Sequence, residues 1–100
     1  AFTWFDAAEG MGHAGPVETA LLRHVRPDLV REERVAEAAE GAAERWGEWV
    51  AGVNLAHDSD EFAPNGVVGD PREGDAERGA ALLDAARDAL MDLIDAVAER

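Results

Sequence analysis

The sequence contains no cysteine and no lysine, and each absence excludes a class of site or partner. Without cysteine, neither disulfide bonds nor thiolate metal sites can form. All nine basic residues are arginine, against 22 acidic residues, so the net charge is −13. Such an acidic surface repels phosphate backbones and anionic lipids, and we therefore expect no nucleic-acid partner and no membrane partner.

Long apolar runs are also missing. No stretch of the sequence approaches the length needed to cross a bilayer, and no signal-peptide pattern is visible. The expected compartment is the cytoplasm.

Acidic residues are abundant enough to suggest an adaptation to salt. Asp84, Asp88 and Asp92 follow one another at four-residue spacing. Like charges at that spacing destabilise a helix in dilute buffer, and concentrated salt screens the repulsion. The composition therefore favours a halophilic, salt-rich cytoplasm.

The length of 100 residues corresponds to one domain. The chain begins with Ala1 and enters at once an apolar, strand-like run over residues 1–8. An isolated strand leaves its backbone groups without partners. We therefore expect this chain to be a piece of a longer protein.

Three helices are expected. The first begins at Pro16, which suits the first helical position, and stops before Pro27. The second covers residues 31–46, with Gly41 as its weak point. The third begins after Asp75 as N-cap. It continues to the end of the chain with one broad apolar face, made of Leu82, Ala86, Leu90, Leu93, Ile94 and Val97.

A second short strand is expected between Trp49 and His57, followed by a turn at Pro64-Asn65-Gly66. With the strand over residues 1–8, the order of elements is β, α, α, β, α. This order fits a piece of a layered α/β domain.

The loop over residues 10–16 (GMGHAGP) is the best candidate for a functional site. It lies between a predicted strand and a predicted helix, where α/β enzymes commonly bind ligands. The free N–H groups of a helix N-terminus favour a carboxylate, a phosphate or a developing oxyanion. His13 in this loop could exchange protons near neutral pH. The alternative is a histidine that only completes the turn.

Other polar and aromatic residues favour structural roles. His24 is expected on the surface of the first helix. His57 is followed by acidic residues, but a calcium loop starting at Asp58 would need glycine and glutamate where the chain has Ala63 and Gly69. The tryptophans are expected to serve packing or an interface; they are Trp4, Trp46 and Trp49.

Two longer motifs carry a family resemblance. Residues 13–20 (HAGPVETA) and 26–30 (RPDLV) resemble the signature of the creatininase family. Residues 66–71 (GVVGDP), with residues 76–79 (AERG) and 82–83 (LL), are similar to the C-terminal motif of the same family. The motifs occur in the family's order and spacing and cover its C-terminal portion.

The resemblance implies an α/β fold in which residues 1–100 form the C-terminal part of a three-layer α/β/α creatininase-like domain. It implies an amidohydrolase that cleaves a non-peptide C–N bond, an amide or a formamide, in a small nitrogen-rich substrate. Family members are often hexameric and bind divalent metals, commonly Zn, Mn or Fe. The metal ligands come from the N-terminal portion, so here they would lie outside this chain, on a separate chain or segment that acts as its partner.

Two residues of the chain are implied as catalytic. His13 matches the family's active-site histidine, which passes a proton to or from the scissile nitrogen. Glu18 matches the acidic residue of the signature, with orientation of the loop or capping of the helix as its alternative roles. Creatininase itself has a tryptophan and a glutamate at positions that align with Glu9 and Gly12, so creatinine is not the expected substrate.

Several alternatives stay open. The C-terminal half is similar to archaeal members of the family, including a formamidopyrimidine-ribotide deformylase. A peptidase of the mycofactocin-maturation type is another possibility. A different class is a non-catalytic acidic interaction domain, which would bind a partner through Trp46, Trp49 and the apolar face of the last helix.

Overall fold

Helices and one small hairpin make up the regular structure of this computed structural model, which describes residues 3, 8 and 10–100. The helices are α1 (Pro16–Val25), α2 (Glu32–Glu40) and α3 (Ala76–Ala98), with short 3-10 turns η2 (Pro27–Leu29), η3 (Ser59–Glu61) and η4 (Pro71–Glu73); the strands are β1 (Trp49–Val50) and β2 (Val53–Asn54). The first strand expected over residues 1–8 lies largely outside the described residues.

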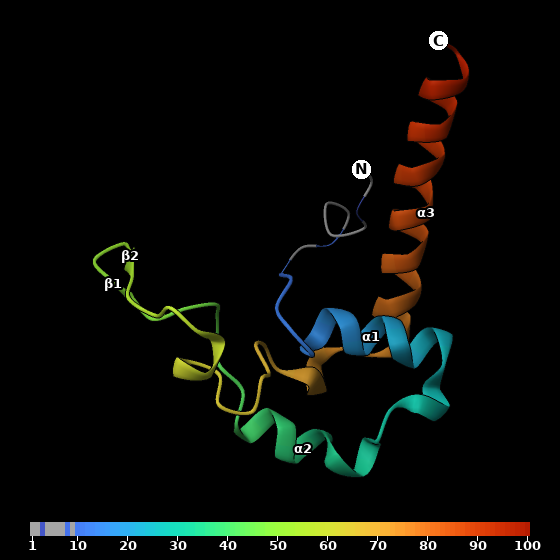
Figure 1. The fold of residues 1–100 in the computed structure, drawn as a ribbon. Helices are drawn as coiled ribbons and strands as arrows, with labels where there is room; N and C mark the ends of the chain where they lie inside the picture. The colour runs from blue at the N-terminus through green and yellow to red at the C-terminus, as the bar shows by residue number, and fades with distance from the viewer. Residues whose placement is uncertain (1–2, 4–7, 9) are drawn as a thin grey trace.

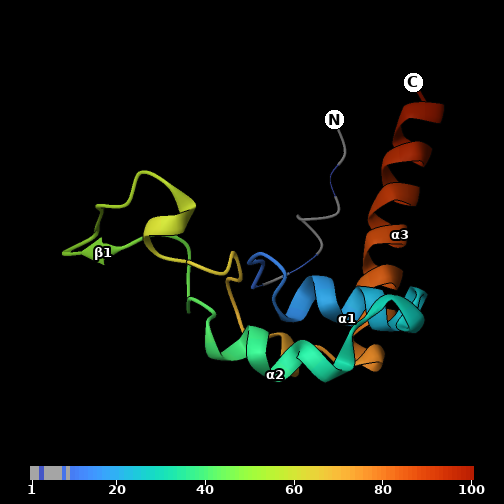
Figure 2. The same cartoon turned by 60° about the horizontal axis from the view of Figure 1, so that its bottom comes forward.

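The chain has a central body and two arms. The body contains α1, α2 and the segment around η4, while α3 extends from one side and the β1–β2 hairpin from the other (Figures 1 and 2). The radius of gyration is 16.0 Å, with extents of 47 × 36 × 17 Å. A compact domain of this length would have a radius of gyration of about 13 Å. Much of the apolar surface therefore remains exposed.

The limits of α1 agree with the sequence. Pro16 occupies its first turn, where the missing N–H costs no hydrogen bond. The helix ends at Val25, and the N–H of Arg26 donates to the carbonyl oxygen of Leu22 over 2.8 Å. The helix thus stops before Pro27, as predicted, and Pro27 begins the 3-10 turn η2.

The second helix is shorter than predicted. It ends at Glu40 rather than near residue 46, with Gly41 as its C-cap. The side-chain amide of Asn65 donates to the carbonyl oxygen of Ala38 over 3.0 Å and so satisfies the last turn. A Cβ atom on Gly41 would lie 2.5 Å from that amide nitrogen. Beyond it, Ala43 pairs with residues 67–69, which draws the chain away from the helix axis.

The predicted strand between Trp49 and His57 is a hairpin. β1 and β2 pair antiparallel, with Trp49 opposite Asn54 and Val50 opposite Val53. The two turn residues, Ala51 and Gly52, have φ of 49° and 80°. Positive φ at both positions is the geometry of a tight two-residue hairpin turn. Helices and strands are both present, as the α/β class predicts, but the described residues contain only this two-stranded sheet and isolated bridges.

Close packing of α1 on α3 depends on a glycine at the contact. Gly79 on α3 is buried, and a Cβ atom there would lie 1.9 Å from the carbonyl oxygen of Ala20. Ala20 itself has no exposed surface. The small core of the described chain lies around this contact and beside η4; its buried apolar residues are Val17, Ala20, Ala63, Val67 and Val68.

Arg23 on α1 links three parts of the chain. Its guanidinium donates to the carbonyl oxygens of Pro71, over 3.1 Å, and Gly74, over 2.6 Å. It also forms a two-pronged ion pair with Glu32, at 2.8 and 2.9 Å. The side chain of Arg23 is 14% exposed and that of Glu32 is 59% exposed. Arg23 therefore fastens α1 to the start of α2 and to the connection between η4 and α3.

We expect Glu32→Gln to weaken this attachment at neutral pH and to have little effect in acid. The hydrogen bonds from Arg23 lower the pKa of Glu32 below its ordinary value of 4.5. A carboxylate whose pKa is lowered by folding stabilises the fold above its ordinary pKa, and that stabilisation is lost as the pH falls through the lowered pKa.

Thermal unfolding of the whole protein at about pH 7 and about pH 2 measures the effect. Glu37→Gln is the matched control, because Glu37 forms only a 3.4 Å, exposed pair with Arg34. If Glu32→Gln lowered the unfolding midpoint equally at both pH values, the ion pair would not be the cause.

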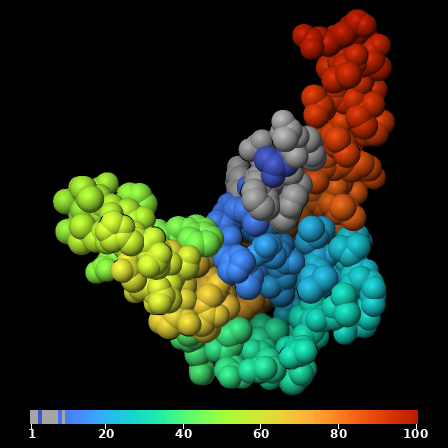
Figure 3. Space-filling view, viewed as in Figure 1, coloured from blue at the N-terminus to red at the C-terminus, as the bar shows by residue number. Residues whose placement is uncertain are grey.

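The predicted start and apolar face of α3 are confirmed. The carboxylate of Asp75 accepts the N–H of Arg78 over 2.8 Å and caps the helix. The outer turns stand clear of the body (Figure 3), and their apolar residues Leu90, Leu93, Ile94 and Val97 are exposed. Within the described part of the chain, no helix has both the length and the apolar character that crossing a membrane requires.

The acidic side of α3 predicts a response to salt. Asp84, Asp88 and Asp92 are all exposed, and Arg87 lies 3.4 Å from Asp84 and 3.3 Å from Asp88, whereas Asp92 has no such pair among the described residues. We expect KCl to raise the unfolding midpoint, because repulsion of a few tenths of a kcal/mol per pair is screened at about 1 M salt. We expect Asp92→Asn to reduce that dependence. A midpoint that did not rise with KCl would remove the halophilic interpretation.

Candidate functional site

The loop that carries His13 is fixed by backbone pairing with a distant segment. The N–H of His13 donates to the carbonyl oxygen of Val68 over 3.0 Å, and the N–H of Val68 donates to that of His13 over 2.8 Å. On its other side, residues 67–69 pair with Ala43, through N–H···O bonds of 2.9 and 2.8 Å. Three segments distant in the sequence thus form a short stretch of sheet with His13 at its edge.

Two glycines of the loop permit this contact. A Cβ atom on Gly12 would lie 2.0 Å from the carbonyl oxygen of Val68, and one on Gly15 would lie 2.5 Å from it. Neither φ is positive, so the requirement is for space rather than for an unusual backbone conformation. These glycines bring the imidazole-bearing loop against the sheet segment.

Glu18 turns back from the first turn of α1 onto the loop. Its carboxylate accepts the N–H of Ala14, and the hydroxyl of Thr19 donates to the carbonyl oxygen of Ala14 over 3.4 Å. Ala14 has φ of 53°, a strained conformation for alanine. Glu18 therefore holds the strained residue between His13 and the helix, and this contact corresponds to the loop-orienting role among its predicted alternatives.

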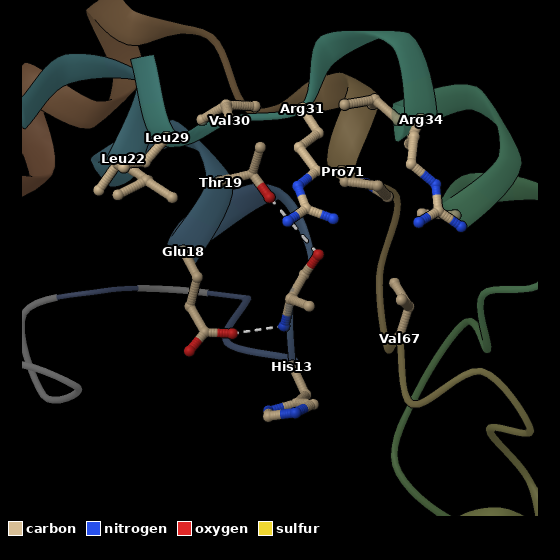
Figure 4. A pocket seen from close by; sticks show the side chains of 13 residues that line it. His13, Glu18, Thr19, Leu22, Leu29, Val30, Arg31, Arg34, Val67 and Pro71 are labelled. Atoms are coloured by element: carbon tan, nitrogen blue, oxygen red, sulfur yellow. Dashed lines mark hydrogen bonds between the residues drawn. The ribbon is translucent and has the colours of Figure 1, made fainter. Parts of the chain in front are cut away.

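The His13 side chain is exposed and lies beside aromatic residues. The centres of the His13 and Trp46 rings are 6.2 Å apart, with the planes tilted by 50°. Trp46 in turn packs edge-on against Phe62, with ring centres 5.7 Å apart. In Figure 4 the imidazole points away from the cavity side of its loop. The imidazole is therefore accessible to a molecule that binds at the exposed surface formed by His13 and Trp46.

A cavity of about 440 Å³ opens on the other side of the loop, between α1, α2 and the η4 segment. Its wall is mostly apolar, with His13, Glu18, Thr19, Arg31 and Arg34 as the polar members. Both guanidinium groups point toward the side on which Glu18 and His13 lie (Figure 4). The volume suits a small organic molecule rather than a macromolecule.

The remaining candidate residues are not brought to this cavity. His24 and His57 are exposed, and His24 lies at the end of α1 away from the loop. The acidic residues after His57 have a structural role: the Glu61 carboxylate accepts the N–H groups of His57 and Asp58. Those hydrogen bonds lower the pKa of Glu61. This capping arrangement explains the acidic cluster that sequence reasoning considered, and rejected, as a calcium loop.

Metal ligands do not cluster in the described part of the chain. No group of three or more histidine, aspartate or glutamate side chains there could hold a metal ion.

Sequence reasoning missed the partners of the loop. Nothing in the local pattern pointed to Val68 as the pairing residue of His13, to Trp46 as its ring neighbour, or to Arg31 and Arg34 as part of the same cavity wall. The GVVGDP motif that contains Val68 was the only available signal, because it accompanies the histidine motif in the family that the chain resembles.

Comparison with protein families matches residues 3–94 to the family described as creatininase, creatinine amidohydrolase. Comparisons with curated proteins and with solved structures found no match. The family match spans nearly the whole 100-residue chain and includes both the His13 loop and the Val68 segment that holds it. The chain therefore belongs to the creatininase family.

Proposed function

We propose that the chain is the C-terminal part of a metal-dependent amidohydrolase that cleaves an amide or formamide C–N bond, not a peptide bond, in a small nitrogen-rich substrate. The observation that carries the proposal is the position of His13. It matches the active-site histidine of the family motif, its backbone N–H and carbonyl oxygen are both hydrogen-bonded to Val68, and its side chain is exposed ahead of α1.

Members of this family typically depend on divalent metals, and the described residues offer no metal site of their own. We propose that the metals, of the Zn, Mn or Fe type, are held by residues of an N-terminal portion outside this chain. When bound, they would supply activated water for attack on the carbonyl carbon.

The contribution of this chain would be proton transfer. The imidazolium of His13 would donate its proton to the leaving nitrogen as the C–N bond breaks, and the product would leave as an amine. The fixed backbone and the neighbouring Trp46 ring would limit the positions of the imidazole. The first N–H groups of α1 would stabilise negative charge in the substrate.

The exposed apolar surface supports the presence of a further polypeptide portion. Leu90, Leu93, Ile94 and Val97 on α3 and Val50 and Val53 on the hairpin are exposed. An apolar surface of this kind commonly marks a contact with another part of a protein. Family membership makes the N-terminal portion of the same enzyme a better candidate for that contact than the unrelated partner of a non-catalytic domain.

Family membership also supports a proposal about the complete domain and its oligomeric state. We propose that the sheet segment around Val68 is continued by strands of the N-terminal portion into a three-layer α/β/α domain, and that the enzyme is a cytoplasmic homo-oligomer of hexameric type. The double pairing of residues 67–69, with His13 on one side and Ala43 on the other, supports a sheet at this position.

The test of the proton donor is His13→Ala in the assembled, metal-loaded enzyme. We expect kcat to fall by about 10²–10⁴-fold, the usual contribution of a positioned acid or base, with metal content unchanged. His57→Ala is the matched control, because that histidine is exposed and is not part of the cavity wall. An unchanged kcat in His13→Ala would refute the assignment.

The role of Glu18 is tested by a pair of substitutions. Glu18→Gln keeps an oxygen that can accept the N–H of Ala14, whereas Glu18→Ala removes it. We expect the glutamine variant to keep most of the wild-type kcat and the alanine variant to lose about tenfold or more, because the loop then lacks its anchor. If both variants were as impaired as His13→Ala, Glu18 would itself take part in proton transfer.

A further inference from the structure

The cavity beside the His13 loop has a charge balance opposite to that of the chain. The sequence has 22 acidic residues against nine arginines. The charged residues in the cavity wall, apart from His13, are two arginines, Arg31 and Arg34, and one carboxylate, Glu18. In a protein with so many acidic residues, a cavity wall with more arginines than carboxylates is unexpected.

Arg31 has fewer side-chain interactions than Arg34. Among the described residues its side chain forms no hydrogen bond and no ion pair, whereas Arg34 is 3.4 Å from Glu37. Arg23, Arg26, Arg72 and Arg87 are each paired with a carboxylate, whereas Arg78 and Arg100, like Arg31, have no ion pair among the described residues. Of these three, only Arg31 lies in the wall of this cavity. Although Arg31 is the N-cap residue of α2, its side chain makes no capping hydrogen bond. The Arg31 guanidinium therefore contributes no hydrogen bond and no ion pair to the fold of the described residues.

The one carboxylate of the wall is already engaged. Glu18 accepts the N–H of Ala14 and is thereby turned toward the loop. Figure 4 shows the guanidinium groups of Arg31 and Arg34 extending toward the side on which Glu18 lies. The rest of the wall is mostly apolar, with Leu22, Val35 and Val67 among its members.

We propose that this cavity binds an anionic group, a carboxylate or a phosphate, at Arg31, with the apolar body of the same small molecule against α1 and α2. A guanidinium offers a planar, two-pronged donor set that matches either anion. The inference goes beyond the proposed function and does not rest on it. Because the His13 imidazole points away from the cavity side of its loop, the anion site at Arg31 is a binding site distinct from the position of proton transfer.

Binding of matched probes tests the inference without any turnover. The probes are N-benzoylglycine, its neutral analogue N-benzoylglycinamide, and phenyl phosphate, each titrated by calorimetry into the metal-loaded full-length protein. We expect one or both anions to bind at least about tenfold more tightly than the neutral amide, which corresponds to about 1.4 kcal/mol. The tighter of the two anions identifies the group that the cavity takes.

Arg31→Ala should remove that preference, and Arg31→Lys should restore part of it, because lysine keeps the charge but not the two-pronged geometry. Arg87→Ala is the control: it removes the same charge from the exposed surface of α3, and we expect it to leave the preference unchanged. Unfolding midpoints should be equal for wild type and Arg31→Ala, since the side chain makes no contact that the fold needs among the described residues.

Three outcomes would overturn the inference: no binding of either anion, equal binding of the neutral amide, or an unchanged preference in Arg31→Ala. Each is separate from a failure of the proposed reaction. Loss of the anion preference with normal turnover of neutral amides would leave the role of His13 intact, and anion binding in an inactive protein would leave the Arg31 site intact.

Discussion

The candidate site depends on one short segment, residues 67–69, that pairs with two others. Val68 exchanges two backbone hydrogen bonds with His13, while Val67 and Gly69 bond to Ala43 on the opposite side. Val68 is 2% exposed, so these polar groups are satisfied in a dry environment, where an unpaired one would be costly. The pairing fixes the position of the His13 loop relative to α1. It also directs the chain away from the axis of α2, so that the helix ends. The conformation of the His13 loop and the end of α2 thus both depend on pairing with residues 67–69.

Small residues make the rest of this arrangement possible. Gly12 and Gly15 allow the loop to approach Val68, and Gly74 and Gly79 allow the start of α3 to approach α1. A Cβ atom on Gly74 would lie 2.1 Å from the carbonyl oxygen of Pro16. α1 is therefore clamped at both ends of its buried side, by the loop before it and by the helix that crosses it. Because α1 presents Glu18 to the loop, these contacts also position the candidate catalytic residues.

The sequence was sufficient where local chemistry decides the conformation. Pro16 and Pro27 set the limits of α1, and Asp75 set the start of α3, because each acts on its own backbone neighbours. It was insufficient where distant segments compete. The end of α2 depends on Asn65 and on the pairing of Ala43, neither of which is visible in the periodicity of residues 31–46. The motif HAGPVETA located His13 and Glu18, but the hydrogen bond from Ala14 to Glu18 required coordinates.

The absence of lysine has a structural consequence that the charge count alone does not reveal. Arg23 serves two carbonyl oxygens and both oxygens of Glu32 at once, a task that needs several donors in a fixed plane. An ammonium group has its donors on one atom and could not span these acceptors with the same geometry. In this chain arginine therefore provides connections as well as positive charge. Arg31, like Arg78 and Arg100, has no such connection among the described residues, and it lies in the wall of the cavity beside the His13 loop.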